Sequence, residues 1–417
     1  MRKLRLLAAM MVPLLVVMAS NTQALTAAPA AQGSAQTFTI TAGRAFASQA
    51  GEKSDWYAHK FYMDNVTINV GDSVLWKQNS EAEPHTVTFL GADKKIPETP
   101  LIEEPAGGQG PPTITENPLH FFKQGGDTYD GQAYTNSGFM SSEIPGPKEY
   151  RLTFPTAGTF QYLCLLHASP SEDGSLQGMV GTVTVQAAGS AYPKTPAQVM
   201  ADADAMIQAD LQKTATFKSE IDKLHTTQPG PNGTTIHHIK AGFFSPPDGL
   251  EYLRFVPREA MIMVGDTVEW TSMGFHTVTF GGEPELILVQ PQPQGPPKAV
   301  YNPEVIFPVG ESNYGGTGYN NSGLLVPGPL PPEAPPILGE KHTLTFTQPG
   351  RFEYICVTHY DMGMDATITV QARTGAEQPG MPTTGGNNWL PFLILGLGMT
   401  LTLAGLSLRL RKSPKAL

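Results

Sequence analysis

The sequence predicts an all-β protein that contains two tandem β-sandwiches. Glycine (43 residues) and proline (38 residues) are abundant, and only 15% of the 417 residues are charged. This composition is typical of short strands joined by many turns. Segments with alternating apolar character, such as 66–70 and 261–268, predict strands. The strongest observation is that one set of segments occurs twice in the same order, which indicates two copies of one fold.

The interior of the chain is a tandem repeat. Three pairs of segments carry it most clearly: 70–76 (VGDSVLW) with 264–270 (VGDTVEW), 84–89 (PHTVTF) with 275–280 (FHTVTF), and 162–167 (YLCLLH) with 354–359 (YICVTH). Because every pair keeps its place in the order, the pattern indicates a duplicated unit. We therefore predict two domains, residues 37–187 (repeat 1) and residues 236–372 (repeat 2).

Residues 195–224, between the repeats, predict an amphipathic linker helix. Thr195 is a suitable N-cap, and Pro196 suits the first helical position. Apolar residues then follow at helical spacing: Val199, Met206, Ile207, Leu211, Phe217, Ile221 and Leu224. We expect this helix to dock on one repeat or between the two.

Each repeat also contains a long insert, at 91–148 and at 281–340. Both inserts are rich in proline and glycine, so we expect large ordered loops packed on one end of each sandwich. Asn136-Ser137 and Asn321-Ser322 recur within them, each before a glycine. These residue types favour turns, and a role close to a metal is the alternative.

Both ends of the chain predict export and membrane attachment. Residues 1–24 have the basic, apolar and small-residue order of a signal peptide. Residues 389–408 form an apolar run long enough for a transmembrane helix, and the basic tail 409–417 favours a cytoplasmic end. The stalk 373–388 contains Met-Pro-Thr-Thr-Gly, which resembles the sortase signal except at its first position. The protein is then either a membrane-anchored or a wall-linked cell-surface protein.

The charge balance excludes some partners. The formal net charge is −10, and seven of the 27 basic residues lie in the leader and the tail, which contain no acidic residue. An acidic surface argues against nucleic acid as a partner. There are only two cysteines, one in each repeat. A disulfide between them is the simplest prediction for an exported protein, but their equivalent positions place each inside its own sandwich.

Each repeat contains the same four side-chain types in the same order. A lone histidine follows a strand, a Cys-x-x-His comes later, and a methionine precedes the final strand. The residues are His85, Cys164, His167 and Met179 in repeat 1, and His276, Cys356, His359 and Met364 in repeat 2. A copper ion that alternates between its cuprous and cupric states suits this set, because it combines a soft thiolate, two imidazoles and a weak thioether.

The methionine of repeat 2 has a competitor. Met362 and Met364 both follow His359 closely. We assign Met364, because it follows a glycine and directly precedes the last strand, as Met179 does in repeat 1. Met362 is then a packing residue.

With these motifs, each repeat resembles the plastocyanin or cupredoxin family. The resemblance covers residues 37–187 and 236–372 apart from the inserts. It implies two tandem cupredoxin-like Greek-key β-sandwiches joined by the amphipathic helix, with the C-terminal transmembrane helix after them. It also implies that the eight residues above are copper ligands, which gives two type 1 (blue) copper ions. Repeat 2 keeps the plastocyanin spacing between His359 and Met364, whereas repeat 1 has a longer segment between His167 and Met179.

The function implied is electron transport at the outer face of the membrane, with redox partner proteins. One alternative is an oxidase or nitrite reductase, but those families typically add His-x-His pairs, and the sequence contains none. The other alternative is a copper-binding surface protein without a redox partner. Four histidines have no counterpart in the other repeat, and we interpret them as surface or local hydrogen-bonding groups: His59, His120, His225 and His342.

Overall fold

The structure is a computed structural model that describes residues 34–47, 53–97, 101–105, 111–142, 146–171, 173–295, 297–332, 334–335 and 337–373. The predicted leader, the sortase-like segment, the apolar run 389–408 and the basic tail lie outside these residues. In the part of the chain that is described, no helix is long and apolar enough to cross a membrane. The described chain is mostly β, as the composition predicts.

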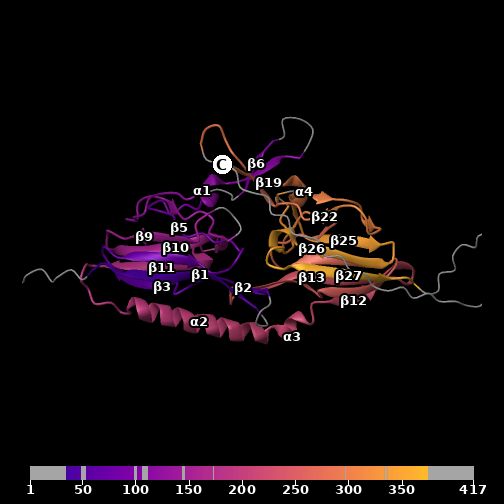
Figure 1. Ribbon diagram of the computed structural model, residues 1–417, viewed down its shortest axis with the longest axis horizontal. Helices are drawn as coiled ribbons and strands as arrows, with labels where there is room; N and C mark the ends of the chain where they lie inside the picture. Colours follow the sequence, from indigo (N-terminus) through magenta and orange to yellow (C-terminus); the bar gives the residue numbers. More distant parts are fainter. Residues whose placement is uncertain are drawn as a thin grey trace, which may run out of the picture. The chain divides into compact units, whose positions relative to one another are not determined.

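One large sheet runs through both repeats (Figure 1). Its strands, in order, are β21 (Asn313–Tyr314), β25 (Lys341–Phe346), β16 (Thr267–Ser272), β13 (Thr235–Ser245), β14 (Leu250–Val256), β2 (Trp56–Tyr62), β1 (Thr37–Phe46), β4 (Ser73–Gln78) and β9 (Glu149–Thr153), with β12 (Thr226–Pro229) on β13. Strands β14 and β2 pair in antiparallel fashion, with Glu251 opposite Tyr57. The two repeats are therefore hydrogen-bonded edge to edge.

Each repeat adds a second sheet of its own. In repeat 1 the order is β3 (Asn65–Asn69), β11 (Leu176–Gln186), β10 (Gly158–Pro170), β5 (Thr88–Phe89) and β8 (Thr135–Asn136). In repeat 2 it is β15 (Glu259–Met263), β27 (Asp365–Gln371), β26 (Gly350–Ile355), β17 (Thr279–Phe280), β22 (Asn320–Ser322) and β20 (Pro308–Val309). Apolar side chains from both sheets form a core in each repeat, around Trp76 and Trp270.

The repeated Gly-Asp turn explains how the two sheets of each repeat are tied together. Asp72 accepts hydrogen bonds from the backbone N–H groups of Gln36 and Asn69, at 2.7 and 2.8 Å. Asp266 accepts the equivalent bonds from Thr235 and Met263, both at 2.8 Å. A buried carboxylate with two such donors fixes the start of one strand against the end of another.

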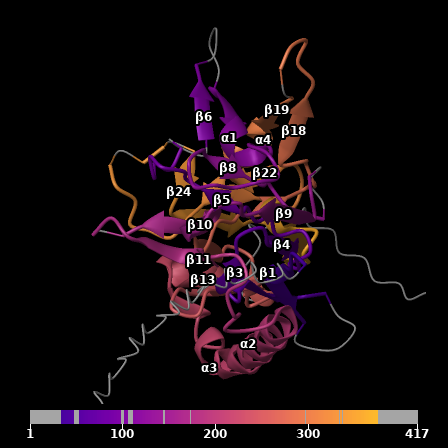
Figure 2. The ribbon, with the colours of Figure 1, turned by 90° about the vertical axis from the view of Figure 1, so that its left-hand side faces the viewer.

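The inserts differ from the loops that the sequence predicts. Four of their strands pair into one shared sheet in the order β18 (Ile287–Gln290), β19 (Lys298–Tyr301), β7 (Thr113–Glu116) and β6 (Leu101–Glu104). The Tyr301 hydroxyl donates to Glu116 across the repeats at 2.8 Å. Figure 2 shows this sheet on the side of the molecule opposite α2. The inserts thus form a second connection between the repeats.

Short elements complete the inserts. Asn117 and Asn302 cap two single-turn helices, each with a proline at its first position. These elements are α1 (Pro118–Phe121), α4 (Pro303–Ile306) and the paired strands β23 (Leu324–Leu325) and β24 (Leu338–Gly339). The caps are equivalent in the two repeats, so the duplication extends into the inserts.

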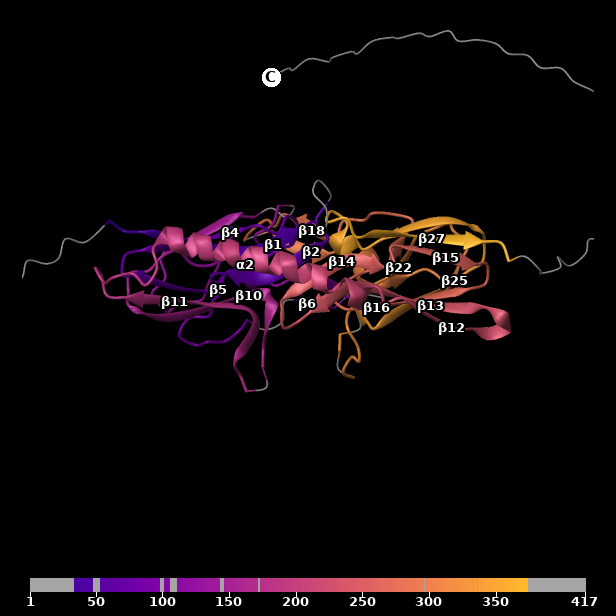
Figure 3. The same cartoon turned by 90° about the horizontal axis from the view of Figure 1, so that it is seen from below.

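The linker is helical, as the sequence predicts. Helix α2 (Pro196–Thr216) begins with a Thr195–Gln198 capping box, and the short α3 (Lys218–Ile221) follows it. Helix α2 packs on β1 and β2, through Val199, Ala203 and Ile207 (Figure 3). The expected apolar stripe was too wide, because Met206 and Leu211 are 37% and 39% exposed. The helix therefore docks mainly on repeat 1, and its C-cap residue Phe217 also packs on Phe243 of repeat 2.

Candidate metal centres

Centre 1 consists of His85, Cys164 and His167. The Nδ1 atoms of the two histidines lie 3.1 Å apart. The Cys164 Sγ atom lies 3.4 Å from Nδ1 of His167 and 4.0 Å from Nδ1 of His85. His85 and Cys164 are fully buried. One sulfur and two imidazole nitrogens therefore converge on a single point that is shielded from water.

Centre 2 repeats this geometry with His276, Cys356 and His359. Its two Nδ1 atoms are 3.0 Å apart, and Cys356 Sγ lies 3.7 and 3.5 Å from them. These two triads are groups whose donor atoms all lie within 4.8 Å of one another. Both cysteines are free thiols. The structure brings together the six histidine and cysteine residues that the sequence predicts, as two sets of three.

The chain positions the methionines by different local structures. In repeat 1 the β10–β11 register shifts between Leu163 and Ala168, opposite Gly178 and Val180, so Met179 faces the segment that carries Cys164. In repeat 2, Cys356 donates its backbone N–H to the Met364 carbonyl at 2.9 Å. Both methionine side chains are fully buried. Their role as axial ligands stays a prediction.

A glycine approaches the outer side of the first histidine in each centre. Gly43 has φ +69° and Gly242 has φ +76°, within bulges of β1 and β13. A Cβ atom at either position would overlap Nε2 of His85 or His276. Only glycine fits there, because it accepts positive φ and has no side chain. The Ala-Gly pairs at 42–43 and 241–242 recur in the sequence, so the repeat comparison could have identified them.

Each thiol receives a backbone hydrogen bond. The N–H groups of Thr86 and Thr277 donate to Sγ of Cys164 and Cys356, both at 3.3 Å. Hydrogen bonding to sulfur favours the thiolate, which is the form that binds metal.

Buried hydrogen bonds connect the insert asparagines to these threonines. Asn136 accepts from the Thr88 hydroxyl at 2.9 Å, and the Thr88 and Thr86 hydroxyls lie 3.0 Å apart. Thr86 in turn accepts from the N–H of Leu165, the residue after the cysteine, at 2.8 Å. Asn321, Thr279, Thr277 and Val357 form the same series in repeat 2. The asparagines therefore support the cysteine loops, beyond the turn chemistry that the sequence favours.

The electrostatics of both centres favour metal binding. Burial would raise the pKa of each thiol, but the histidine charges and hydrogen bonds lower the pKa of Cys164 and bring that of Cys356 well below its usual value. Burial opposes protonation of His167, yet the Cys164 thiolate raises the pKa of His167 to about 10. The buried thiolate is balanced by one proton on an imidazole, and a metal cation can replace that proton. The donor set therefore fits a copper ion.

The two centres differ at one position beside the sulfur. The Thr358 hydroxyl lies 2.9 Å from Cys356 Sγ. The equivalent residue in repeat 1 is Leu166, which has no hydroxyl group. The sulfur of centre 2 therefore has a side-chain hydroxyl beside it, whereas the Cys164 thiol is hydrogen-bonded by the backbone of Thr86 and Leu166.

Two carboxylates face the outer nitrogens of the ligands, and sequence reasoning missed both. Glu83 Oε1 lies 3.1 Å from Nε2 of His167, and its Oε2 lies 3.7 Å from Nε2 of His359. Glu251 lies 3.4 Å from Nε2 of His276 and 2.9 Å from Nε2 of His59. Of the two alternatives for His59, a surface position is wrong, because the side chain is 7% exposed; its Nε2 pairs with Glu251 of the other repeat.

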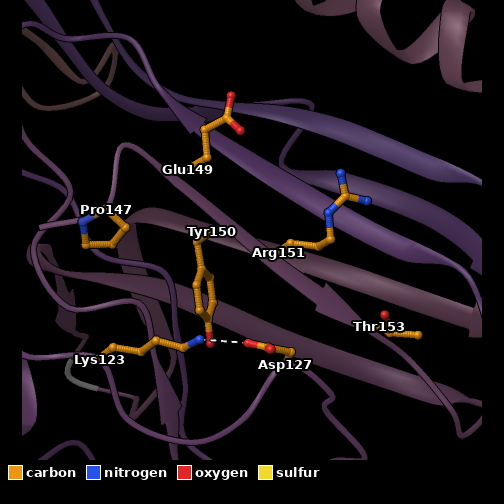
Figure 4. A pocket seen from close by; sticks show the side chains of 7 residues that line it. All are labelled: Lys123, Asp127, Pro147, Glu149, Tyr150, Arg151 and Thr153. Carbon is orange, nitrogen blue, oxygen red and sulfur yellow. Dashed lines mark hydrogen bonds and ion pairs between the residues drawn. The ribbon is translucent and has the colours of Figure 1, made fainter.

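A surface pocket of repeat 1 contains none of the predicted ligands. It is lined mainly by β9 residues, with the Lys123–Asp127 ion pair at 2.7 Å on one side (Figure 4). It is an ordinary polar surface feature.

The comparison with protein families identifies one segment. Residues 336–371 match the copper-binding plastocyanin/azurin family. This segment contains Cys356, His359 and Met364, so the match falls on three of the four predicted ligands of repeat 2. A search of curated proteins finds no match.

Solved structures of cupredoxins also match parts of the chain. A copper(I) form of an amicyanin mutant is 19% identical, over 36% of this chain and 82% of that chain, with a TM-score of 0.18. A purple cupredoxin from Nitrosopumilus maritimus is 17% identical, over 36% of this chain and 99% of that chain, also with a TM-score of 0.18. Scores this low support no inference about this protein by themselves.

Proposed function

We propose that this protein is a copper electron carrier with two type 1 centres, one in each repeat. The observation that carries the proposal is the duplicated His-Cys-His geometry, with both cysteines buried as free thiols. The family match over residues 336–371 supports copper as the metal of centre 2. Centre 1 is proposed to bind the same metal, because its donor atoms and sulfur hydrogen bonds are equivalent.

The residues of each centre would hold copper in both of its oxidation states. The bound copper supplies one-electron chemistry, and the thiolate and two imidazoles suit both the cuprous and cupric ions. The rigid strands and the hydrogen bonds to sulfur keep the donor atoms in place, so little rearrangement accompanies the gain or loss of an electron. Both sulfurs are fully buried, so the thiolates are shielded from water. These properties favour electron transfer over substrate binding.

A potentiometric titration of the copper-loaded protein tests this function. We expect two reversible one-electron steps, and loss of the visible absorbance on reduction. Irreversible reduction, or turnover of oxygen or nitrite at a rate that explains copper reoxidation, would instead favour an enzyme. Binding of copper without reversible reduction would favour a copper-binding surface protein.

We expect centre 2 to have the higher reduction potential, because the Thr358 hydroxyl can stabilise the thiolate charge. Thr358→Val should lower the potential of centre 2 by roughly 20 to 60 mV, on the scale of one neutral hydrogen bond. The potential of centre 1 should stay the same. Leu166→Val, at the equivalent position of centre 1, is the matched control and should change neither potential. An unchanged potential of centre 2 in Thr358→Val would contradict this role of the hydroxyl.

We also propose that the repeats lie outside the cell membrane, held by the apolar run 389–408. This proposal rests on the sequence of the two ends alone. Protease added to intact cells should digest residues 37–372, and complete protection of these residues would contradict it.

A further inference from the structure

The outer nitrogens of the proposed ligands meet at the contact between the two repeats. When a histidine binds a metal through Nδ1, its Nε2 carries a hydrogen and needs an acceptor if it is buried. His167 and His359 both direct Nε2 towards Glu83: His167 is hydrogen-bonded to it at 3.1 Å, and His359 lies at an ion-pair distance of 3.7 Å. Each histidine faces a different oxygen of this carboxylate. One carboxyl group therefore lies between a ligand of centre 1 and a ligand of centre 2.

A second series of contacts runs beside the first. Glu251 lies between Nε2 of His276 and Nε2 of His59, at 3.4 and 2.9 Å. The ring of His59 contacts the ring of His167, with a centroid distance of 4.0 Å. This series also starts at a ligand of centre 2 and ends at a ligand of centre 1.

The fold holds these residues in register. Strands β2 and β14 pair directly, and the His59 N–H donates to the Gly249 carbonyl at 2.8 Å. Arg254 reaches from β14 to the carbonyls of Ser54 and Met362, at 3.0 and 3.1 Å. The carboxylate contacts between the two centres are thus part of the ordered contact between the repeats.

Burial also favours a bridge. Glu83 is 6% exposed, and its two oxygens face Nε2 of His167 and Nε2 of His359. Its side chain is therefore enclosed between the two repeats. Within the described chain, His59, Glu83 and His167 also lie close enough to hold a metal ion. However, Glu83 is already paired with His167, and we assign this cluster to the bridge.

We propose that the two centres form a coupled pair that exchanges electrons directly, with Glu83 as the bridging group. The inference rests on the proposed function. The step is the transfer of one electron from a cuprous centre to a cupric centre, after which the first is cupric and the second cuprous. No bond breaks and no further reactant is needed. Electrons tunnel better through bonded and hydrogen-bonded groups than across open gaps, and the carboxylate fills the gap between two ligand imidazoles.

Electron transfer between the two centres has a preferred direction. The side chain of His167 is 15% exposed, that of His359 is 11% exposed, and His85 and His276 are fully buried. His167 and His359 are therefore the ligands that an external redox partner can approach in each centre. The additional hydroxyl beside the sulfur of centre 2 favours the electron there. An electron within the pair therefore moves towards centre 2.

The test is a kinetic measurement on the whole copper-loaded protein. A flash-generated reductant supplies less than one electron per chain, and the redistribution between centres is followed by absorbance and by rapid-freeze paramagnetic resonance. The single-centre variants Cys164→Ser and Cys356→Ser provide the reference spectra. We expect a first-order phase whose rate does not depend on protein concentration. Glu83→Ala should slow it by about tenfold or more, and Glu83→Gln should slow it less, because one amide oxygen can still accept from one histidine.

Glu81→Gln is the matched control. Glu81 lies two residues away and bonds Ser54 and Tyr57, at 2.8 and 3.0 Å, but no ligand histidine. It should leave the phase unchanged. A phase whose rate rises with protein concentration in the wild type would overturn the proposal, as would an equal effect of Glu81→Gln and Glu83→Gln.

A second readout does not depend on electron transfer. In the diamagnetic copper(I) protein, nitrogen NMR reports the Nε2 atoms of the histidines. Glu83→Gln should shift the resonances of both His167 and His359, although Glu83 belongs to repeat 1. Unchanged His359 resonances would overturn the bridge. If neither centre binds copper or reduces reversibly, the proposed function itself fails. If both do so but exchange only between molecules, the function stands and the bridge alone is wrong.

Discussion

Replacing either cysteine by serine should abolish one blue centre and leave the other intact. The thiolate is the soft ligand and the source of the visible charge-transfer absorbance, and a serine oxygen supplies neither property. Cys164 and Cys356 belong to separate triads and are both free thiols. Each single variant should therefore lose about half of the bound copper, one ion of the two expected.

The double variant completes this experiment. It should be folded and colourless, because serine is close to cysteine in size and each cysteine is one of many buried residues in the core of its repeat. Metal analysis, visible spectra and circular dichroism of the three variants are the measurements. Loss of all blue absorbance in one single variant would show that the chain has only one such centre.

Alanine at Gly43 or Gly242 should disrupt one centre with an intact set of ligands. A Cβ at these positions would overlap Nε2 of His85 or His276, and both glycines have positive φ. Positive φ and overpacking together should destabilise the fold by about 2 to 5 kcal/mol. The displaced histidine should also lower copper occupancy at that centre alone.

Gly71→Ala separates the two contributions to this effect. Gly71 has φ +93°, and a Cβ atom there would have no neighbouring atom within 4 Å, so only the backbone conformation contributes. The substitution should cost about 1 to 2 kcal/mol and leave both centres occupied. Copper content and thermal unfolding of the three variants show whether the overlap with the histidine, and not the backbone conformation alone, lowers copper occupancy. Full occupancy in Gly43→Ala would contradict the positioning role of this glycine.

The ligands could be predicted because each lies in a short local motif that occurs twice. The Tyr-x-Cys-x-x-His segments are 6 residues long in both repeats, so the duplication alone distinguishes them from an ordinary buried cysteine. The Gly-Asp turn and the Thr195 cap are local for the same reason. Local chemistry determines these features, and one sequence is enough to find them.

The two carboxylates, Glu83 and Glu251, could not be found in this way, because neither has a carboxylate at the equivalent position of the other repeat. Glu83 precedes the first histidine of centre 1, where repeat 2 has Gly274. Glu251 lies on β14 at the position that Tyr57 has on β2. A side chain at Gly274 would overlap Glu251, so the missing side chain leaves space for a carboxylate from a neighbouring strand. A comparison of the repeats overlooks such residues, since the equivalent position in the other repeat has a different residue type.

The shared insert sheet was missed for a related reason. Strands β7 and β19 are short, and the pairing of Thr115 with Val300 joins residues from different repeats. Neither segment predicts its partner, because the pairing depends on how the repeats pack. The linker helix shows the opposite case, in which the cap was predicted correctly but Met206 and Leu211 were expected to be buried. Local patterns predict the helix itself, but they do not determine which of its residues are buried against the sheet.

A copper titration of the metal-free protein from residue 34 to residue 373 tests the central claim most directly. Visible absorbance and paramagnetic resonance should be recorded after each addition. The account predicts that the blue absorbance grows until two copper ions are bound per chain, with type 1 resonance from both. A plateau at one ion per chain, or copper binding without a thiolate charge-transfer band, would contradict it.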